Sequence, residues 1–233
     1  MNQKITIAID GFSSTGKSTL AKQLANELGY VYVDSGAMYR AMTLFAMQKG
    51  FVSLDHLNRE ELIQSIEEAD VSFQFNPNLG YAEIFLNGEN VEGKIRTLEV
   101  SNLVSIVSAI SEVRRKMVAI QKEIGKNKGV VMDGRDIGTV VFQDAELKIF
   151  MTSSAETRAQ RRYDELISKG QKVTYKEVLE NVVERDRIDT TRDDSPLVKA
   201  HDAIEIDNSN LTKEEQFSKV LRLAKEKLSL RNI

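Results

Sequence analysis

Residues 11–18 read Gly11-Phe-Ser-Ser-Thr-Gly16-Lys17-Ser18 and match the phosphate-binding pattern G-x-x-x-x-G-K-S/T, which is the strongest indication of the fold. That pattern is informative when it follows a strand and opens a helix, and both neighbours are predicted here. Lys4–Asp10 is a short, mostly β-branched apolar run typical of a buried parallel strand. The segment after the loop has apolar residues three and four positions apart and ends at Gly29, as a helix does.

This loop has the chemistry needed to bind the phosphates of a nucleotide. Its glycines let backbone N–H groups point at phosphate oxygens, and the helix N-terminus adds partial positive charge. Lys17 is expected to reach the β and γ phosphates, and Ser18 to offer a hydroxyl to Mg²⁺, which prefers oxygen ligands. A glycine-rich turn without a ligand explains the pattern less well, because the flanking strand and helix are both predicted. The predicted phosphate-binding residues are Gly11, Phe12, Ser13, Ser14, Thr15, Gly16, Lys17, Ser18 and Thr19.

Strands and helices continue to alternate beyond the loop. Buried strands are predicted at Tyr30–Val33, Gly129–Asp133, Leu147–Met151 and Ala203–Ile206, each near a helical segment, and Lys213–Leu230 is a predicted closing helix. Such alternation indicates an α/β fold with a parallel sheet that helices cover on both faces.

The pattern changes between about residues 52 and 108. Val71–Phe75 and Tyr81–Leu86 alternate apolar with polar residues, and Asn76-Pro-Asn-Leu-Gly80 joins them, which predicts a hairpin. Asn87-Gly88 predicts a further tight turn. We interpret this region as an antiparallel subdomain inserted into the α/β chain.

Composition excludes several classes of site and partner. The absence of cysteine and the presence of only two histidines, His56 and His201, leave oxygen atoms as the ligands for any metal. A formal charge of −3 argues against a broad surface for nucleic acid or membrane. The first residues lead directly into a strand pattern and no apolar run is long enough to span a bilayer, so we expect a cytoplasmic protein. With no amphipathic heptads to pair, we also expect a monomer.

The same loop occurs in GTPase switches and helicase motors. A GTPase should carry the guanine-reading pattern N-K-x-D, and this chain has none. A motor should be longer and should carry a basic track for its polymer. A nucleotide-dependent switch or binding module remains the alternative to an enzyme.

Arginines set against acidic residues suit phosphoryl transfer, which depends on positioning and on neutralising phosphate charge. Taken alone, Arg158, Arg161 and Arg162 are more typical of a solvated helix face, and the charges of 185–192 are compatible with pairs on an exposed helix. Asp133 and Asp136 instead follow a predicted strand at the carboxyl edge of the sheet, where open α/β folds bind ligands.

The sequence resembles the bacterial cytidylate kinase family, and the resemblance spans almost the whole chain. The matching stretches occur in the expected order, and the longest is the most specific, since adenylate, guanylate and shikimate kinases lack it. They are Asp10-Gly11, Asp34-Ser-Gly-Ala-Met-Tyr-Arg40, Ile95-Arg-Thr-Leu-Glu-Val100, Asp133-Gly-Arg-Asp-Ile-Gly-Thr-Val-Val-Phe142, and Glu184-Arg-Asp-Arg187 followed by Asp189, Arg192 and Ser195-Pro-Leu197.

The resemblance implies a single P-loop kinase domain over residues 1–233 that transfers the γ-phosphoryl group of ATP to CMP, and to dCMP, with Mg²⁺ in pyrimidine nucleotide metabolism. It implies a five-stranded parallel sheet, a monophosphate-binding region at 36–112 and a lid at 153–170. The alternative enzyme is a kinase for another small acceptor, such as UMP, dCMP or shikimate. Where the family pattern has proline after Asp-Gly, this chain has Phe12, which affects the stiffness of the loop.

The resemblance also implies roles for individual residues. Those on the acceptor side contact the monophosphate (Ser35, Arg40 and Arg135, with Arg192 near the phosphate), the cytosine (Ser105, Arg114 and Asp136) and the sugar (Arg185 and Asp189). Those expected to act in catalysis are Lys17, Arg135, Arg158, Arg162 and Arg192. Arg158 and Arg162 would be lid arginines, in contrast to the solvated face that their spacing alone favours.

Overall fold

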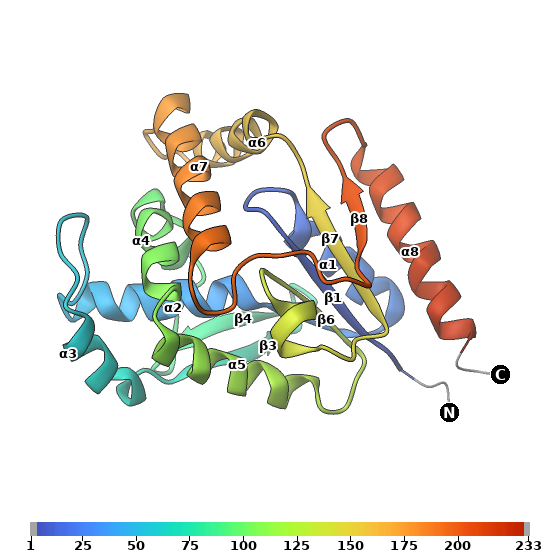
Figure 1. The fold of residues 1–233 in the computed structure, drawn as a ribbon, viewed down its shortest axis with the longest axis horizontal. Coiled ribbons are helices and arrows are strands. Elements are labelled where there is room, and N and C mark those ends of the chain that lie inside the picture. Colours follow the sequence, from blue (N-terminus) through green and yellow to red (C-terminus); the bar gives the residue numbers. More distant parts are fainter. Residues whose placement is uncertain (1–3, 231–233) are drawn as a thin grey trace.

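A computed structural model describes residues 4–230 of the chain (Figure 1). Its centre is a five-stranded sheet in which every neighbouring pair is parallel, in the order β2-β6-β1-β7-β8. The strands are β1 (Thr6–Gly11), β2 (Val31–Asp34), β6 (Val130–Gly134), β7 (Leu147–Thr152) and β8 (Ile204–Asp207). All five strands predicted from the sequence are present, so the predicted parallel α/β sheet is confirmed.

Helices cover both faces of this sheet. On one face, α1 (Lys17–Leu28) and α8 (Lys213–Ser229) pack against Ile7, Ile9 and Ile149. On the other face, α2 (Ser35–Gln48), α5 (Ser111–Gly125) and a short helical turn at Ile137–Val141 enclose a second apolar layer around Ala8 and Met132. β1 is buried along its whole length because it lies in the middle of the sheet between both layers.

The inserted region forms a second, three-stranded sheet, β3-β4-β5. β3 (Val71–Asn76) and β4 (Tyr81–Leu86) pair antiparallel, and Asn87 and Gly88 turn the chain with positive φ angles of 50° and 79° into β5 (Glu89–Asn90). The predicted hairpin and turn are therefore confirmed. The short helix α3 (Arg59–Gln64) precedes this sheet, and α4 (Leu98–Ser108) follows it and packs on α2.

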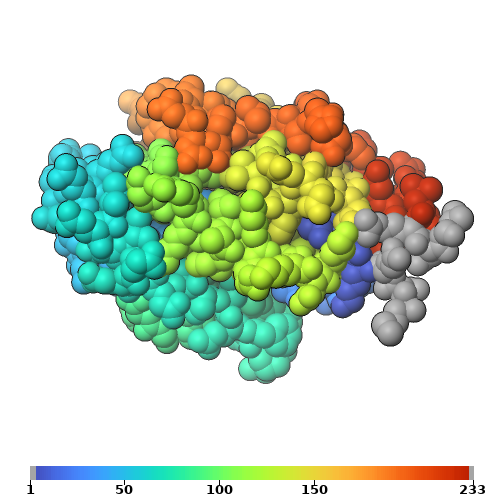
Figure 2. Space-filling view, turned by 60° about the horizontal axis from the view of Figure 1, so that its bottom comes forward, coloured from blue at the N-terminus to red at the C-terminus, as the bar shows by residue number. Residues whose placement is uncertain are grey.

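Two further helices lie at the end of the sheet toward which β7 points (Figure 1). α6 (Ala155–Ser168) and α7 (Tyr175–Thr191) pack together through a small apolar cluster of their own, made by Ala159, Leu166, Val178 and Val182. α7 also contacts α4, and Figure 2 shows the orange surface of α7 and the following segment along one edge, beside the green surface of α4 and α5. Within residues 4–230, no helix has both the length and the apolarity to cross a membrane.

Candidate active site

The phosphate-binding loop connects β1 to α1 at the carboxyl edge of the sheet. Gly16 has a φ of 86° directly before the first turn of α1, a conformation that favours glycine. Gly11 is required for a different reason, since a Cβ atom there would lie 2.0 Å from the carbonyl oxygen of Met151 on β7. The loop thus has the strand, glycines and helix that the sequence predicted.

Lys17 folds back into the loop. Its Nζ donates to the carbonyl oxygen of Phe12 at 2.5 Å and lies 3.4 Å from the Thr15 hydroxyl oxygen. Burial, together with the positive charge of Arg135, lowers the pKa of Lys17 to about 7. The hydrogen-bond partners of the ammonium group are therefore weak and neutral. Phosphate oxygens can take their place and would form much stronger, charge-assisted hydrogen bonds with Lys17.

This pKa predicts that phosphate binding is coupled to proton uptake. Above pH 7, Lys17 loses its proton in the protein without nucleotide. Bound phosphate oxygens favour the charged form of the lysine, so Lys17 should regain the proton when the nucleotide binds. Binding of Mg-ATP at pH 8 should therefore take up close to one proton, and binding at pH 6 should take up almost none. Affinity should fall by at most about tenfold per pH unit above 7. Titration calorimetry in two buffers of different ionisation enthalpy measures the uptake.

The control for this prediction is Lys17→Met, which should bind Mg-ATP more weakly and without the uptake at pH 8. Equal proton uptake by the variant and the unaltered protein would show that another group titrates.

Ser18 and Asp133 form an oxygen pair beside the loop. Ser18 Oγ donates to Asp133 Oδ2 at 2.9 Å, and the Tyr32 hydroxyl donates to Oδ1 at 2.9 Å. Burial, and then the neighbouring charge of Asp34, raise the pKa of Asp133 to about 6, so the carboxylate is ionised at neutral pH. Residues 4–230 hold no group of three or more His, Cys, Asp or Glu side chains placed to bind a metal by themselves.

A compact cavity brings together every acceptor-side residue that the resemblance implied. It lies between α2, α4, α5, α7 and the end of β6, and its lining includes Ser35, Arg40, Ser105, Arg114, Arg135, Asp136, Arg185, Asp189 and Arg192. These residues are separated by up to 157 positions in the chain yet face one space. A second, larger cavity of about 710 Å³ adjoins it and is lined by phosphate-loop residues Ser13, Ser14, Gly16, Lys17, Ser18 and Thr19 and by Arg162. Gly11, Phe12 and Thr15 support the loop from outside both linings.

The far end of the compact cavity carries a buried ion pair between Arg114 and Asp136. Arg114 also donates to the carbonyl oxygen of Ser108 at 3.0 Å, and its guanidinium lies 5.3 Å from the centre of the Tyr39 ring. Arg114 Nε has no hydrogen-bond partner among residues 4–230. A planar ligand edge with both donors and acceptors fits this end, because a carboxylate and a guanidinium are presented side by side.

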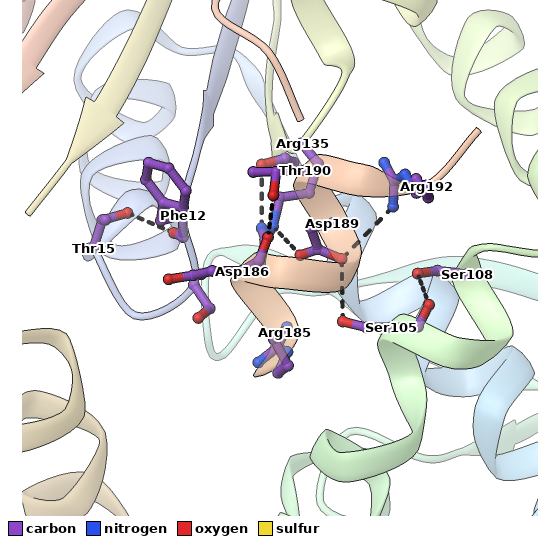
Figure 3. A network of polar contacts seen from close by, with 12 residues as sticks. Phe12, Thr15, Ser105, Ser108, Arg135, Arg185, Asp186, Asp189, Thr190 and Arg192 are labelled. Carbon is purple, nitrogen blue, oxygen red and sulfur yellow. Dashed lines mark hydrogen bonds and ion pairs between the residues drawn. The ribbon is translucent and has the colours of Figure 1, made fainter. Parts of the chain in front are cut away.

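Asp189 on α7 connects three other predicted residues (Figure 3). Its carboxylate accepts from Arg135 Nε at 2.9 Å and from Ser105 Oγ at 3.1 Å, and lies 3.7 Å from Arg192 Nη1. Burial by itself raises the pKa of Asp189, but the positive charges of Arg135, Arg185 and Arg192 outweigh it and hold the pKa below its usual range. Asp189 is therefore an ionised acceptor on the cavity wall.

The two cavities meet at a surplus of positive charge. Gly36, Arg40, Gly134, Arg135 and Arg185 line both of them. Burial and the charge of Arg135 lower the pKa of Arg185 to about 10, and burial with the charge of Arg185 likewise lowers the pKa of Arg40. Cations that repel one another at a shared opening create a strong site for a phosphate anion.

Arg158 and Arg162 on α6 are 4 % and 8 % exposed, so the interpretation of this part of the helix as a solvated face is wrong. Arg162 lines the larger cavity, pairs with Glu165 at 2.8 Å and donates to the carbonyl oxygen of Arg96 at 3.1 Å. Arg158 lies beside the phosphate loop and pairs with Asp186 at 2.6 Å. Their burial depends on distant partners that helical spacing does not reveal.

An exposed-helix interpretation also fails for part of residues 185–192, since Asp189 and Arg192 are 3 % and 8 % exposed. Only Arg187, paired with Glu184 at 2.6 Å, behaves as that interpretation expected. Both histidines are exposed and lie outside the linings of the two cavities.

Two further residues shape the site, and no role was predicted for either from the sequence. Asp10 accepts from the backbone N–H groups of Ile137 and Gly138 at 2.8 and 2.7 Å, which holds the turn that follows Asp136. Asp34 caps α2 and pairs with Arg96 at 2.8 Å. Asp10 and Asp34 stand in the motifs that carry the resemblance, so their acidic side chains at strand ends were the available signal.

The chain is similar over most of its length to proteins that share one name. The chain matches the family described as Cytidylate kinase over residues 7–226. It is 67 % identical over 224 residues to a protein named Cytidylate kinase from Flavobacterium johnsoniae, which covers 96 % of this chain and 97 % of that protein. A protein of the same name from Bacteroides fragilis is 60 % identical over 214 residues, covering 92 % of this chain and 93 % of its own length.

Proposed function

This chain belongs to the cytidylate kinase family, which transfers a phosphoryl group from ATP to CMP, and we propose how its own residues carry out that transfer. The observation that carries the proposal is the meeting of two cavities, one lined by the phosphate loop and one ending in the buried Arg114–Asp136 pair. ATP occupies the first and the monophosphate the second. The reaction gives ADP and CDP.

The acceptor phosphate lies at the shared opening, held by Ser35, Arg40, Arg135 and Arg192, in line with the γ-phosphorus. Its oxygen attacks directly, without a covalent enzyme intermediate, because a phosphate dianion is already nucleophilic. Lys17 and Arg135, joined by Arg158 and Arg162 as the lid closes, neutralise the charge that develops on the transferred group. Closure of residues 153–170 excludes water and limits wasteful hydrolysis of ATP.

Cytosine is recognised by Asp136, Arg114 and Ser105, since its N4 amino group donates while O2 and N3 accept. Arg185 and Asp189 contact the sugar, and both CMP and dCMP are acceptors. Residues 36–112 form the monophosphate-binding part of a single kinase domain spanning residues 1–233. We place the protein in the cytoplasm as a monomer in pyrimidine nucleotide metabolism.

Mg²⁺ fits beside the phosphate loop, because Ser18 and Asp133 present oxygen atoms there and Mg²⁺ commonly uses few protein ligands together with substrate phosphates. When bound, Mg²⁺ would neutralise charge on the β and γ phosphates. Ser18 would ligate it directly, and Asp133 would orient the Ser18 hydroxyl or a coordinated water.

A coupled assay of ADP release with Mg-ATP tests the proposed acceptor specificity. The panel contains CMP, dCMP, UMP, AMP, GMP, shikimate and no acceptor. Fast turnover with CMP and dCMP alone is expected. Equal turnover with UMP would contradict the proposed roles of Asp136 and Arg114, and turnover without an acceptor would contradict the water-excluding lid.

A further inference from the structure

Arg158 lies where three parts of the molecule meet: the phosphate loop, the end of β7 and helix α7. Each of its three guanidinium nitrogen atoms donates at least one hydrogen bond. Nε donates to the carbonyl oxygen of Ser153 at 3.0 Å, Nη1 donates to that of Ser13 at 3.3 Å, and the two Nη atoms bind the two Asp186 oxygens at 3.1 and 2.6 Å. A forked pair of this kind restricts both the position and the plane of an arginine.

The ring of Phe12 forms one more wall of this site. The Arg158 guanidinium lies 5.1 Å from the centre of the Phe12 ring, and that ring packs edge-on against Phe150 at 6.1 Å. An arginine is attracted to the face of an aromatic ring. The carbonyl oxygen of Phe12 also accepts from Lys17 Nζ, so this loop residue contacts both Lys17 and Arg158.

Asp186 belongs to α7, on which Arg185 and Asp189 face the acceptor cavity. Asp186 itself lines neither cavity, and both of its carboxylate oxygens accept from Arg158. Its side chain is 17 % exposed, so the pair is largely shielded from water. This placement gives Asp186 no contact with a nucleotide. Its carboxylate instead fixes the position of the buried Arg158 guanidinium next to Ser13.

We propose that Asp186 is a positioning residue for the transfer step: its carboxylate, together with the Phe12 ring, holds the Arg158 guanidinium at the edge of the phosphate loop. This inference rests on the proposed role of Arg158 in neutralising the transferred group. Arg158 lines neither cavity in this structure, so closure of the lid has to bring it to the phosphates. A cation already held beside the loop loses little freedom in that step, and such preorganisation acts on the transition state more than on binding.

The test is Asp186→Asn, assayed with Mg-ATP and CMP. We expect kcat to fall roughly tenfold to a hundredfold, because small displacements of a catalytic group have effects of this size. The KM for CMP should stay within about threefold, since Arg185 and Asp189 remain in place. A change that merely disturbed α7 would instead raise the KM for CMP, so an increase in that KM with kcat unchanged would overturn the proposal.

A double-mutant cycle with Arg158→Met shows whether Asp186 acts through Arg158. If it does, the kcat of the double variant equals that of Arg158→Met alone. A further fall in the double variant would overturn the proposal. This comparison also decides the matter if Asp186→Asn does not fold, because the double variant leaves no buried charge unpaired.

Two outcomes separate failure of this inference from failure of the proposed role of Arg158. If Arg158→Met keeps the kcat of the unaltered enzyme, the proposed role of Arg158 fails and the inference fails with it. If Arg158→Met loses activity and Asp186→Asn does not, the inference alone is wrong. Glu184→Gln is the matched control, because it breaks the exposed pair with Arg187 on the same helix and should change neither constant.

Discussion

Replacement of Lys17 by methionine is expected to lower kcat by about 10³-fold, the upper range for removing one group that stabilises transition-state charge. Lys17 is the lysine of the phosphate loop and lines the larger cavity. Without its ammonium group, negative charge on the transferred phosphoryl group and on the leaving ADP is less well neutralised. The KM for CMP should change little, because Lys17 lies outside the lining of the acceptor cavity. Steady-state kinetics with each substrate varied in turn measures both constants.

The fold should survive this change. Among residues 4–230, the Lys17 side chain donates hydrogen bonds to Phe12 and Thr15 of its own loop, so its removal leaves no distant hydrogen-bond partner unpaired there. Lys49→Met, at an exposed pair with Glu68, is the matched control for loss of one lysine charge and should leave kcat unchanged. A Lys17→Met enzyme with near-normal kcat would mean that charge on the γ-phosphate is neutralised by other residues.

Asp136→Ala is expected to raise the KM for CMP roughly 100-fold, which corresponds to the loss of one buried hydrogen bond to a charged group. The KM for ATP should rise far less, because Asp136 lines the acceptor cavity and not the cavity of the phosphate loop. Kinetic constants for both substrates, measured on one preparation, give the comparison. Equal increases in the two KM values would contradict the assignment of Asp136 to cytosine.

Stability has to be measured alongside, since removing one partner of a buried ion pair costs about 3–5 kcal/mol. Arg114 would keep the more exposed Asp194, 3.8 Å from its Nε, as a carboxylate neighbour. Asp136→Asn retains the shape of the side chain and offers an amide, so it should impair CMP more than UMP, whose O4 accepts where cytosine N4 donates. Asp144→Ala, at an exposed carboxylate a short distance along the chain, should leave both KM values unchanged.

Much of the fold could be predicted because its signals are local. Each buried strand is a short apolar run, the hairpin alternates and has its turn residues, and α1 ends at Gly29 with a φ of 64°. The structure moves the first strand's start from the predicted Lys4 to Thr6, since Lys4 is exposed and lies before the sheet pairing begins. The phosphate loop could also be predicted from the sequence, because glycines, lysine and serine at this fixed spacing are typical of phosphate binding.

The acceptor site is different, because its residues are far apart in the sequence. Residue chemistry alone singled out Asp133 and Asp136, whereas the base, sugar and phosphate contacts came from the resemblance to a family. The tertiary structure is what brings Ser35 on α2, Ser105 on α4 and Arg192 after α7 to one cavity. No periodicity in the sequence predicts that these residues line one cavity, because their proximity depends on how helices from the inserted region pack on α7.

The parallel sheet, the inserted hairpin and the phosphate loop follow from the amino-acid sequence, because backbone conformation and apolar spacing specify these over a few residues. Which charges are buried depends on how the helices pack together. Arg158 and Arg162 have the spacing of a solvated face, yet they are buried because Asp186 on α7 and the Arg96 carbonyl from the inserted region meet them. The free energy of a buried charge is set by its partners in space, and those partners lie up to 145 residues away in the chain.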